Sequence, residues 1–232
     1  MPSLPPLPDP ESGPPVRPVT GRRRPDAIPR LSVGCLDDVR PGSLLVALPG
    51  LTDPTFAGTV VYVLDHSDSG TLGVVLGRPS QVEIRDVLPG WSDLAVDPAV
   101  FHVGGPCETD TALCLAVAPT DPATGAPYSE DDGVRRGGLR RVADDVHLVD
   151  LDGDASALAG QIQGLRVFAG YAGWSTGQLA GEIAEGAWAC VPGRAHDILS
   201  GAAGPALWRQ VMGRQSGRLG VLSTAPADPT TN

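Results

Sequence analysis

The chain has 232 residues, 41% of them hydrophobic and 19% charged, a balance typical of a globular protein with an apolar core. All 17 basic side chains are Arg, and the 27 acidic residues give a formal net charge of −10, which disfavours direct nucleic-acid binding but leaves room for a local basic patch. The apolar runs are too short to span a bilayer and no secretory signal precedes them, so we expect a cytoplasmic protein without a membrane segment.

The first part of the chain is predicted to be a disordered or polyproline-like tail. Residues 1–30 contain ten of the 24 prolines and almost no periodic apolar pattern. The run Arg22-Arg23-Arg24 could contact an acidic partner, although such a run is more often simply solvated. We expect a single folded domain over residues 31–232.

Short apolar and β-branched segments predict the strands of a sheet. The first three, at 43–48, 59–64 and 71–76, are separated by Pro and Gly turns. Their near-continuous hydrophobicity predicts burial on both faces. Further strands are predicted at 100–103, 111–117, 146–151, 165–169 and 187–191.

Four segments have the apolar spacing of short helices, and together with the strands they predict an α+β fold. The helices are predicted at 81–88, 154–162, 176–185 and 205–214. Ser175 or Thr176 is placed to cap the third helix, and Pro205 lies in the first turn of the fourth. The polar, Gly- and Pro-rich stretch at 119–138 is predicted to be a long exposed loop.

Residues 173–177 match the Gly-x-Ser-x-Gly pattern of a hydrolase nucleophile, between a predicted strand and a predicted helix. Such a hydrolase needs an acid and then a histidine further along the chain. Only His196 follows Ser175, and 21 residues are too few for the strands that usually carry both partners. The pattern therefore does not predict a catalytic serine.

No group of residues predicts a metal or cofactor site. Asp150, Asp152 and Asp154 imitate the start of a calcium loop, but Ala155 stands where that loop requires Gly. A strand end followed by helix-capping aspartates is the better interpretation. The histidines at 66, 102, 147 and 196 form no ligand pair.

The cysteines are expected to be buried free thiols, because no Cys-x-x-Cys pair occurs among them. They lie at positions 35, 107, 114 and 190. Cys107 is the candidate for reactivity, since it follows the turn at 104–106 and could lie at the edge of a loop.

The Gly-rich segment 170–178 is interpreted as a loop around which the fold is organised. Its glycines allow a tight bend or a close approach of another group, and the amides at the following helix start are suited to an anion. Tyr171 and Trp174 either fix this loop on the core or face a ligand.

Motifs along the chain resemble those of the YqgE/AlgH family of bacterial proteins over residues 40–232. The matching segments are 42–47, 53–56, 59–62, 73–79, 104–106, 170–174, 177–179, 186–188 and 228–232, with His66, Glu182 and Trp208. The resemblance implies a compact α+β fold, in which a strongly bent mixed β-sheet forms a pseudo-barrel flanked by helices. It implies no activity, because members are generally described as uncharacterised and sometimes as transcriptional regulators.

Two departures from the family pattern concern the candidate residues. Gly77 stands where relatives usually have Asn, and Ser175 and Thr176 stand where relatives often have a small residue and Pro. A hydroxyl group that relatives can omit is a poor candidate for a nucleophile.

We therefore expect a non-catalytic binding or regulatory domain without a cofactor. Its candidate surface, for an unknown protein or small-molecule partner, consists of Arg78, Gly104, Gly105, Tyr171, Trp174, Ser175, Thr176 and Gln178. One alternative is a transcriptional regulator that acts through a protein partner. Another is a weak hydrolase or thiol enzyme that uses Ser175 or Cys107.

Overall fold

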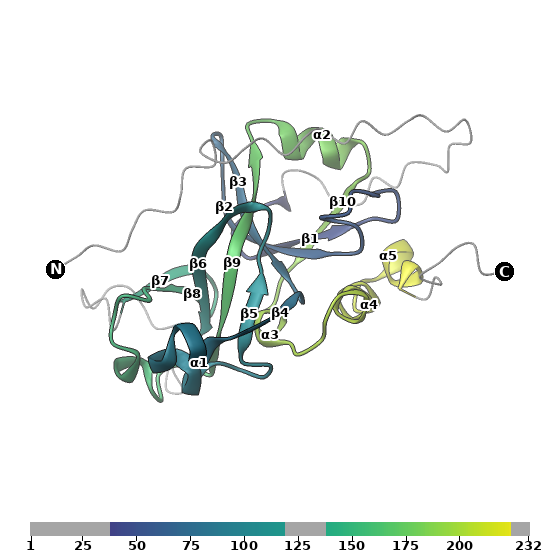
Figure 1. Cartoon of the computed structure of the whole chain (residues 1–232). Coiled ribbons are helices and arrows are strands. Elements are labelled where there is room, and N and C mark those ends of the chain that lie inside the picture. Colours follow the sequence, from purple (N-terminus) through teal and green to yellow (C-terminus); the bar gives the residue numbers. More distant parts are fainter. Residues whose placement is uncertain (1–37, 119–137, 224–232) are drawn as a thin grey trace.

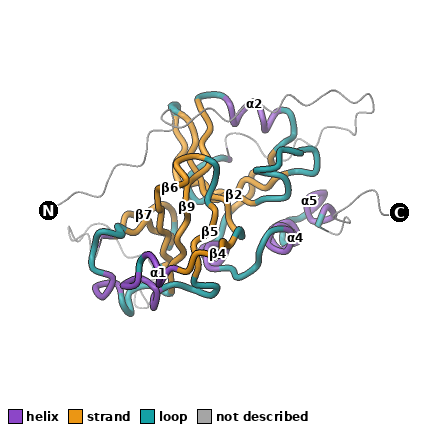
Figure 2. Tube along the Cα trace, in the orientation of Figure 1, coloured by secondary structure: helices purple, strands orange, loops and turns teal. Residues whose placement is uncertain are grey.

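The computed structural model describes residues 38–118 and 138–223 of the chain (Figure 1). The tail predicted at 1–30, the start of the predicted domain with Cys35, nearly all of the loop predicted at 119–138, and residues 224–232 lie outside this part. Within it, strands form the body of the molecule and short helices lie around them (Figure 2).

Ten strands form one mixed sheet. They are β1 (Ser43–Ala47), β2 (Val60–Ser67), β3 (Gly70–Leu76), β4 (Pro79–Glu83), β5 (Val100–Val103), β6 (Cys107–Val117), β7 (Leu139–Ala143), β8 (Val146–Val149), β9 (Gly164–Ser175) and β10 (Trp188–Pro192). The main order is β10-β1-β2-β3-β9-β6-β8-β7, while β5 pairs with β9 and β4 with β5. Only the pairing of β5 with β9 is parallel.

The sheet curls until its two ends meet. Gly42, directly before β1, abuts β7 so closely that a Cβ atom on Gly42 would lie 2.6 Å from the Cβ of Ala143. On the other side, Gly193 follows β10 and donates its N–H to the carbonyl of Gly42 at 3.1 Å. This contact between the ends confirms the expected pseudo-barrel, and the helices around it confirm the α+β class.

Both faces of the sheet are apolar, as the first three strand segments predict. On one face, side chains from seven strands form a cluster that α3 (Ala195–Leu199), α4 (Pro205–Gly213) and α5 (Gly217–Leu222) complete. On the other face, one cluster lies under α2 (Gln178–Ala184). A third cluster lies under α1 (Ile84–Val87) and the 3₁₀ helices η2 (Pro89–Leu94) and η5 (Ala155–Leu158).

The predicted helix at 205–214 is confirmed as α4, but two other helix predictions need correction. Only half of the segment 81–88 forms a helix, because residues 79–83 form β4, which pairs with β5, and leave one helical turn at 84–87. The segment 154–162 contains only the short helix η5. The sequence pattern does not predict α3, α5 or β7.

The prediction of a loop at 170–178 is wrong. The strand expected at 165–169 continues to Ser175, so that β9 has 12 residues and carries most of the Gly-rich segment. The helix that follows begins at Gln178, and its cap is Gly177 with φ 73°, not Ser175 or Thr176.

Candidate functional site

The Gly-rich motifs meet where the chain crosses over β9. At Phe168 and Ala169, β5 pairs with one edge of β9 and β6 with the other, although β5 and β6 follow each other in the chain. The connection through Gly104 and Gly105 must therefore pass over the β9 backbone, and the N–H of Gly104 donates to the carbonyl of Ala169 at 2.8 Å.

Glycine is required at this crossing because the two backbones touch. A Cβ atom on Gly104 would overlap the carbonyl oxygen of Gly170, and one on Gly105 would overlap the carbonyl group of Tyr171. Gly170 also has φ 70°, a conformation that other residues rarely adopt. The crossing gives a structural reason for Gly104, Gly105 and Gly170 that needs no ligand.

Tyr171 and Trp174 lie on opposite faces of β9. Tyr171 is 1% exposed and belongs to the cluster completed by α3 to α5, whereas Trp174 is 1% exposed and belongs to the cluster under α2. The structure therefore brings Tyr171 to Gly104 and Gly105, and Trp174 to the start of α2. It does not bring the two aromatic residues to a common surface.

The indole of Trp174 is part of a buried network around the carboxylate of Glu182 in α2. The Nε1 atoms of Trp174 and Trp188 donate to Glu182 Oε2 at 2.9 and 2.8 Å. Gln178 Nε2 donates to the second carboxylate oxygen at 3.1 Å. The ring of Phe56 packs against both indoles, with centroid distances of 5.9 and 5.6 Å. This network fixes α2 against β9 and β10.

Ser175 and Thr176 are exposed, and their hydroxyl groups take part in local hydrogen bonds. Ser175 Oγ donates to Gln178 Oε1 at 3.2 Å, and the backbone N–H of Ser175 donates to the same oxygen. Thr176 Oγ1 donates to the carbonyl of Asp68 in the turn between β2 and β3 at 3.1 Å. Both hydroxyls therefore fix the start of α2.

Strand register separates Ser175 from the nearest histidine on the neighbouring strands. His66 faces Thr71, and Thr71 faces Trp174, whereas Ser175 faces Gly70. Directly opposed residues point to the same face of a sheet, so His66 and Ser175 point to opposite faces. His66 Nδ1 instead lies 2.7 Å from Thr71 Oγ1. The pair cannot act as nucleophile and base in this arrangement.

Arg78 lies apart from these groups, between β3 and β4. It is half-buried, and burial lowers the pKa of its guanidinium while the carboxylate of Asp53 acts in the opposite direction. Its carbonyl accepts a hydrogen bond from the N–H of Val103 at the end of β5. Arg78 thus adjoins β5 near the crossing but belongs to the β4 side of the molecule.

Cys107, Cys114 and Cys190 are buried free thiols, as expected. Burial raises the pKa of all three, and for Cys107 the carboxylate of Glu108 adds to this effect, while a hydrogen bond with the Gly173 backbone opposes it. A raised pKa reduces the thiolate fraction that a nucleophile needs. Cys107 therefore lacks the electropositive, accessible setting of a reactive cysteine.

Sequence reasoning missed an ion pair that fixes α3. Asp197 has no exposed side-chain surface, and its two carboxylate oxygens accept hydrogen bonds from Arg214 at 2.5 and 2.6 Å. The backbone N–H of Arg194 donates to the same carboxylate at 2.8 Å. Asp197 lies in α3 and Arg214 directly follows α4, and their spacing of 17 residues gives no periodic signal.

A second missed group fixes the other end of α3. Arg166, in β9, is 2% exposed and donates to the carbonyls of Ile198 and Ser200 at 2.9 and 3.2 Å. It also contacts Nε2 of His102, and because a guanidinium only donates, the imidazole is neutral with its proton on Nδ1. Burial first, and then the charge of Arg166, lower the pKa of His102 to about 3. The sequence offered one indication of this group, because Arg166 is a charged residue inside an otherwise apolar predicted strand.

The aspartates that imitate a calcium loop fix turns. Asp150 Oδ1 accepts from the N–H of Asp152 at 3.1 Å, and Asp154 caps η5 by accepting from Ser156 at 2.9 Å. Across residues 38–118 and 138–223, no three potential ligands gather as a metal site would require. In the same ranges, every helix is too short or too polar to cross a bilayer.

Comparisons with known proteins place the chain in a family. Residues 44–220 match the family described as AlgH-like. A UPF0301 protein from Rhodococcus opacus is 45% identical over 194 residues, which are 84% of this chain and 92% of the relative. A UPF0301 protein from Mycobacterium tuberculosis is 44% identical with nearly the same coverage, 84% and 91%.

Solved structures agree with this placement. The crystal structure of protein DIP2367 from Corynebacterium diphtheriae has a TM-score of 0.71 at 30% identity, over 81% of this chain and 93% of that one. The solution structure of the AlgH protein from Pseudomonas aeruginosa has a TM-score of 0.53 at 23% identity, over 89% and 100%, and supports the fold alone. The chain belongs to the AlgH-like family, which confirms the resemblance seen in the sequence.

Proposed function

We propose that this member of the AlgH-like family is a non-catalytic, cytoplasmic domain that binds a partner protein through an exposed apolar surface on β4, α1 and β5. The observation that carries the proposal is the distribution of exposed apolar side chains. Within the described residues four large hydrophobic side chains are exposed, and three of them are Val82, Val87 and Val103, at 49%, 57% and 42%. We call these three residues the valine surface.

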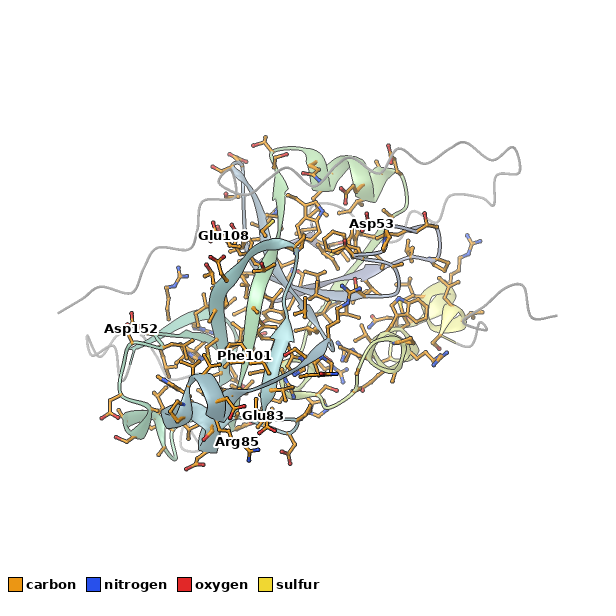
Figure 3. All side chains as sticks on the ribbon, viewed as in Figure 1. Asp53, Glu83, Arg85, Phe101, Glu108 and Asp152 are labelled. Carbon is orange, nitrogen blue, oxygen red and sulfur yellow. The ribbon has the colours of Figure 1, made fainter. Side chains whose placement is uncertain are left out.

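The three valines come from elements that adjoin one another. Val82 lies on β4, and Val87 lies on α1, the single helical turn that continues β4. Val103 ends β5 and follows His102, which pairs with Pro79 of β4. Figure 3 shows Glu83 and Arg85 projecting from this region, below Phe101. Val103 lies beside the start of β4, where its N–H donates to the carbonyl of Arg78, and Val87 lies past the end of β4. Exposed apolar side chains along neighbouring elements favour a surface that binds another protein.

Charge around the valine surface indicates the chemistry of its partner. Residues 79–103 contain four acidic residues and one Arg, and that Arg forms an ion pair with Glu83 at 2.5 Å. The remaining carboxylates favour a partner segment that is apolar and carries basic side chains. A nucleic acid has neither property.

The partner is expected to dock on side chains rather than add a strand to β4. Pro79 has no N–H to donate, and the N–H of Val82 already donates to Ser80 Oγ at 3.1 Å. Proline and satisfied backbone groups are features that protect edge strands from pairing with another chain.

The sequence also suggested a transcriptional regulator and an enzyme. A regulator that acts through a protein partner is compatible with the proposed binding domain. An enzyme that uses Ser175 or Cys107 is less well supported, because Ser175 has no base on its face of the sheet and Cys107 is 4% exposed with a raised pKa.

The test begins with a photo-reactive amino acid at Val87, and at exposed Glu185 as a control. Glu185 directly follows α2, which lies at the opposite end of the molecule from α1 (Figure 1). A partner crosslinked in cells at Val87 alone is then purified and titrated against the wild type and the Val82→Ser, Val87→Ser double variant. We expect the double variant to bind at least about tenfold more weakly.

Two results would overturn the proposal. One is undiminished binding of that partner by the double variant. The other is robust turnover of an ester, phosphate or peptide library by the wild type that disappears in Ser175→Ala or Cys107→Ala.

A further inference from the structure

Charge is distributed unequally between the C-terminal helices and the rest of the structure. Residues 192–223, which contain α3, α4 and α5, carry four Arg and one Asp. The other described residues carry six Arg and 17 acidic residues. The described part thus combines a strongly acidic body with a short basic segment, which the overall net charge conceals.

The acid within this basic segment contributes no exposed negative charge. Asp197 is buried, and Arg214 neutralises it through two hydrogen bonds. Arg194, Arg209 and Arg218 are exposed, and none lies within ion-pair distance of a carboxylate in the described residues. We call these three residues the arginine surface.

Figure 1 places α4 and α5 together at one end of the molecule, on the far side from α1. Arg209 and Arg218, on α4 and α5, therefore lie apart from the valine surface on α1. Arg194 lies at the start of α3, where its N–H and the Arg214 guanidinium at the end of α4 bind the same carboxylate of Asp197. The two surfaces also differ in sign, since the valine surface lies among acidic residues.

We propose that the arginine surface binds an acidic segment of a partner protein. Guanidinium groups without a carboxylate partner can form bidentate hydrogen bonds with Asp or Glu side chains. A short acidic peptide can approach α3 to α5 without facing the acidic body, because its reach is limited to the segment it contacts. This inference rests on the proposed function of a protein-binding domain and adds a second surface to it.

Two other negatively charged occupants, a nucleic-acid duplex and a second copy of the chain, are less well suited to the arginine surface. An extended duplex would bring its phosphates against the body, which has 17 acidic residues against six Arg. Head-to-tail binding of a second copy would satisfy the charges, but it would leave one valine surface and one arginine surface of the pair without a partner.

The test uses the full chain and a fluorescent octaglutamate peptide as the probe, followed by anisotropy. The variant Arg194→Ser, Arg209→Ser, Arg218→Ser removes the arginine surface. The control Arg40→Ser, Arg85→Ser, Arg141→Ser removes the same charge from exposed positions on the body. Circular dichroism verifies that both variants are folded.

We expect the wild type and the control to bind the peptide with affinities within about threefold of each other. The arginine-surface variant should bind at least about tenfold more weakly, and added salt should weaken binding by the wild type. Equal losses in both variants would overturn the inference, because they would indicate a general effect of charge. Undiminished binding by the arginine-surface variant, or no binding by the wild type, would also overturn it.

Two further measurements separate the occupants. A short duplex that binds more tightly than octaglutamate at the same salt concentration would show a nucleic-acid surface instead, and concentration-dependent mass in sedimentation would show self-association. Neither result affects the crosslinking test at Val87, so the failure of this inference can be distinguished from failure of the proposed function.

Discussion

Two short helices, α2 and α3, are each fixed by one buried carboxylate, but the donors around these carboxylates differ. Glu182 of α2 accepts from two indole N–H groups, and no cation lies within ion-pair distance of it in the described residues. Asp197 of α3 accepts from the guanidinium of Arg214 and forms an ion pair. Helices of seven and five residues are too short to be stable alone, so these contacts supply what the local sequence cannot.

The difference in donors shows to which part of the structure each helix is attached. Both indole donors belong to strands next to α2, so that Glu182 ties the helix to the sheet. Arg214 follows α4, so that Asp197 ties one helix to another. We therefore expect α2 to depend on aromatic packing and α3 to depend on charge.

The largest effect is expected from Trp174→Ala, which removes both the ring packing and one hydrogen-bond donor of the network around Glu182. We call this network the α2 anchor. Loss of a buried Trp side chain typically costs about 3–5 kcal/mol of unfolding free energy. Urea unfolding followed by circular dichroism measures it. Trp174→Phe is the matched control, since it keeps most of the ring contacts and should lose less. A stability of Trp174→Ala within about 1 kcal/mol of the wild type would assign Trp174 to recognition instead of packing.

We call the ion pair of Asp197 with Arg214 the α3 anchor. Asp197→Asn should lower the unfolding free energy most among changes to this ion pair, because it leaves Arg214 without its counter-charge. Breaking a buried ion pair by removing one partner costs about 3 kcal/mol. The double variant Asp197→Leu, Arg214→Met should lose less than the sum of its single variants, because neither charge is then left alone. Strict additivity in a double-mutant cycle would show that the two side chains do not interact.

Acid should lower the stability of the fold through His102, which contacts the Arg166 side chain that fixes the end of α3. Its pKa is lowered from 6.5 to about 3 in the folded protein, so the unfolded chain binds the proton more tightly. The stability that this difference provides is fully present above pH 6.5 and is lost as the pH falls toward 3. Between pH 6.5 and 5 the wild type should lose about 2 kcal/mol more than His102→Gln.

The control for this pH dependence is His196→Asn, at an exposed histidine of α3. It should lose stability in parallel with the wild type over the same range. If His102→Gln also follows the wild type, the imidazole is not buried in its neutral form beside Arg166.

Glu182→Gln should have a smaller effect, and it sharpens the contrast with Asp197→Asn. The amide oxygen of Gln can still accept from both indoles, as Glu182 Oε2 does now. Its amide nitrogen would face the donating nitrogen of Gln178, so we expect a loss of about 1 kcal/mol. A loss as large as that of Asp197→Asn would show that the negative charge itself stabilises α2. Chemical unfolding at matched pH decides between these outcomes.

The sequence was sufficient for the elements whose signals are local. The predicted helix at 205–214 and the predicted strand at 100–103 correspond to α4 and β5, because apolar periodicity and Pro205 act within a few residues. The strand prediction for 165–169 stopped too early, since glycines after Ala169 normally indicate a turn. They are needed here because another segment of backbone crosses β9, and that segment is distant in the sequence.

The candidate surface could be predicted only in part, for the same reason. The sequence singled out Trp174 and Gln178, and both belong to the network around Glu182. It could not show that Tyr171 and Trp174 point to opposite faces, because the glycines indicated a loop, whereas residues three apart in a strand point to opposite faces. Contacts such as that of Asp197 with Arg214 depend on how separate helices pack, and no spacing rule describes them.

The smallest effect expected is a gain in stability from Gly181→Ala in α2. Gly181 is exposed, and a Cβ atom there would meet nothing within 4 Å. Ala in a helix interior is favoured over Gly by about 0.5–1 kcal/mol. Gly177→Ala is the matched control, because its Cβ would also meet nothing, but φ 73° makes Ala unfavourable there.

The two glycine variants should therefore change the unfolding free energy in opposite directions, and thermal or urea unfolding measures both. Neither creates a steric conflict, so the comparison isolates backbone conformation around the α2 anchor. If Gly181→Ala stabilises the chain only when Glu182 is intact, α2 forms as a helix because its carboxylate is bound by the indoles. An equal gain in the Glu182→Gln background would instead show that α2 and its anchor contribute independently.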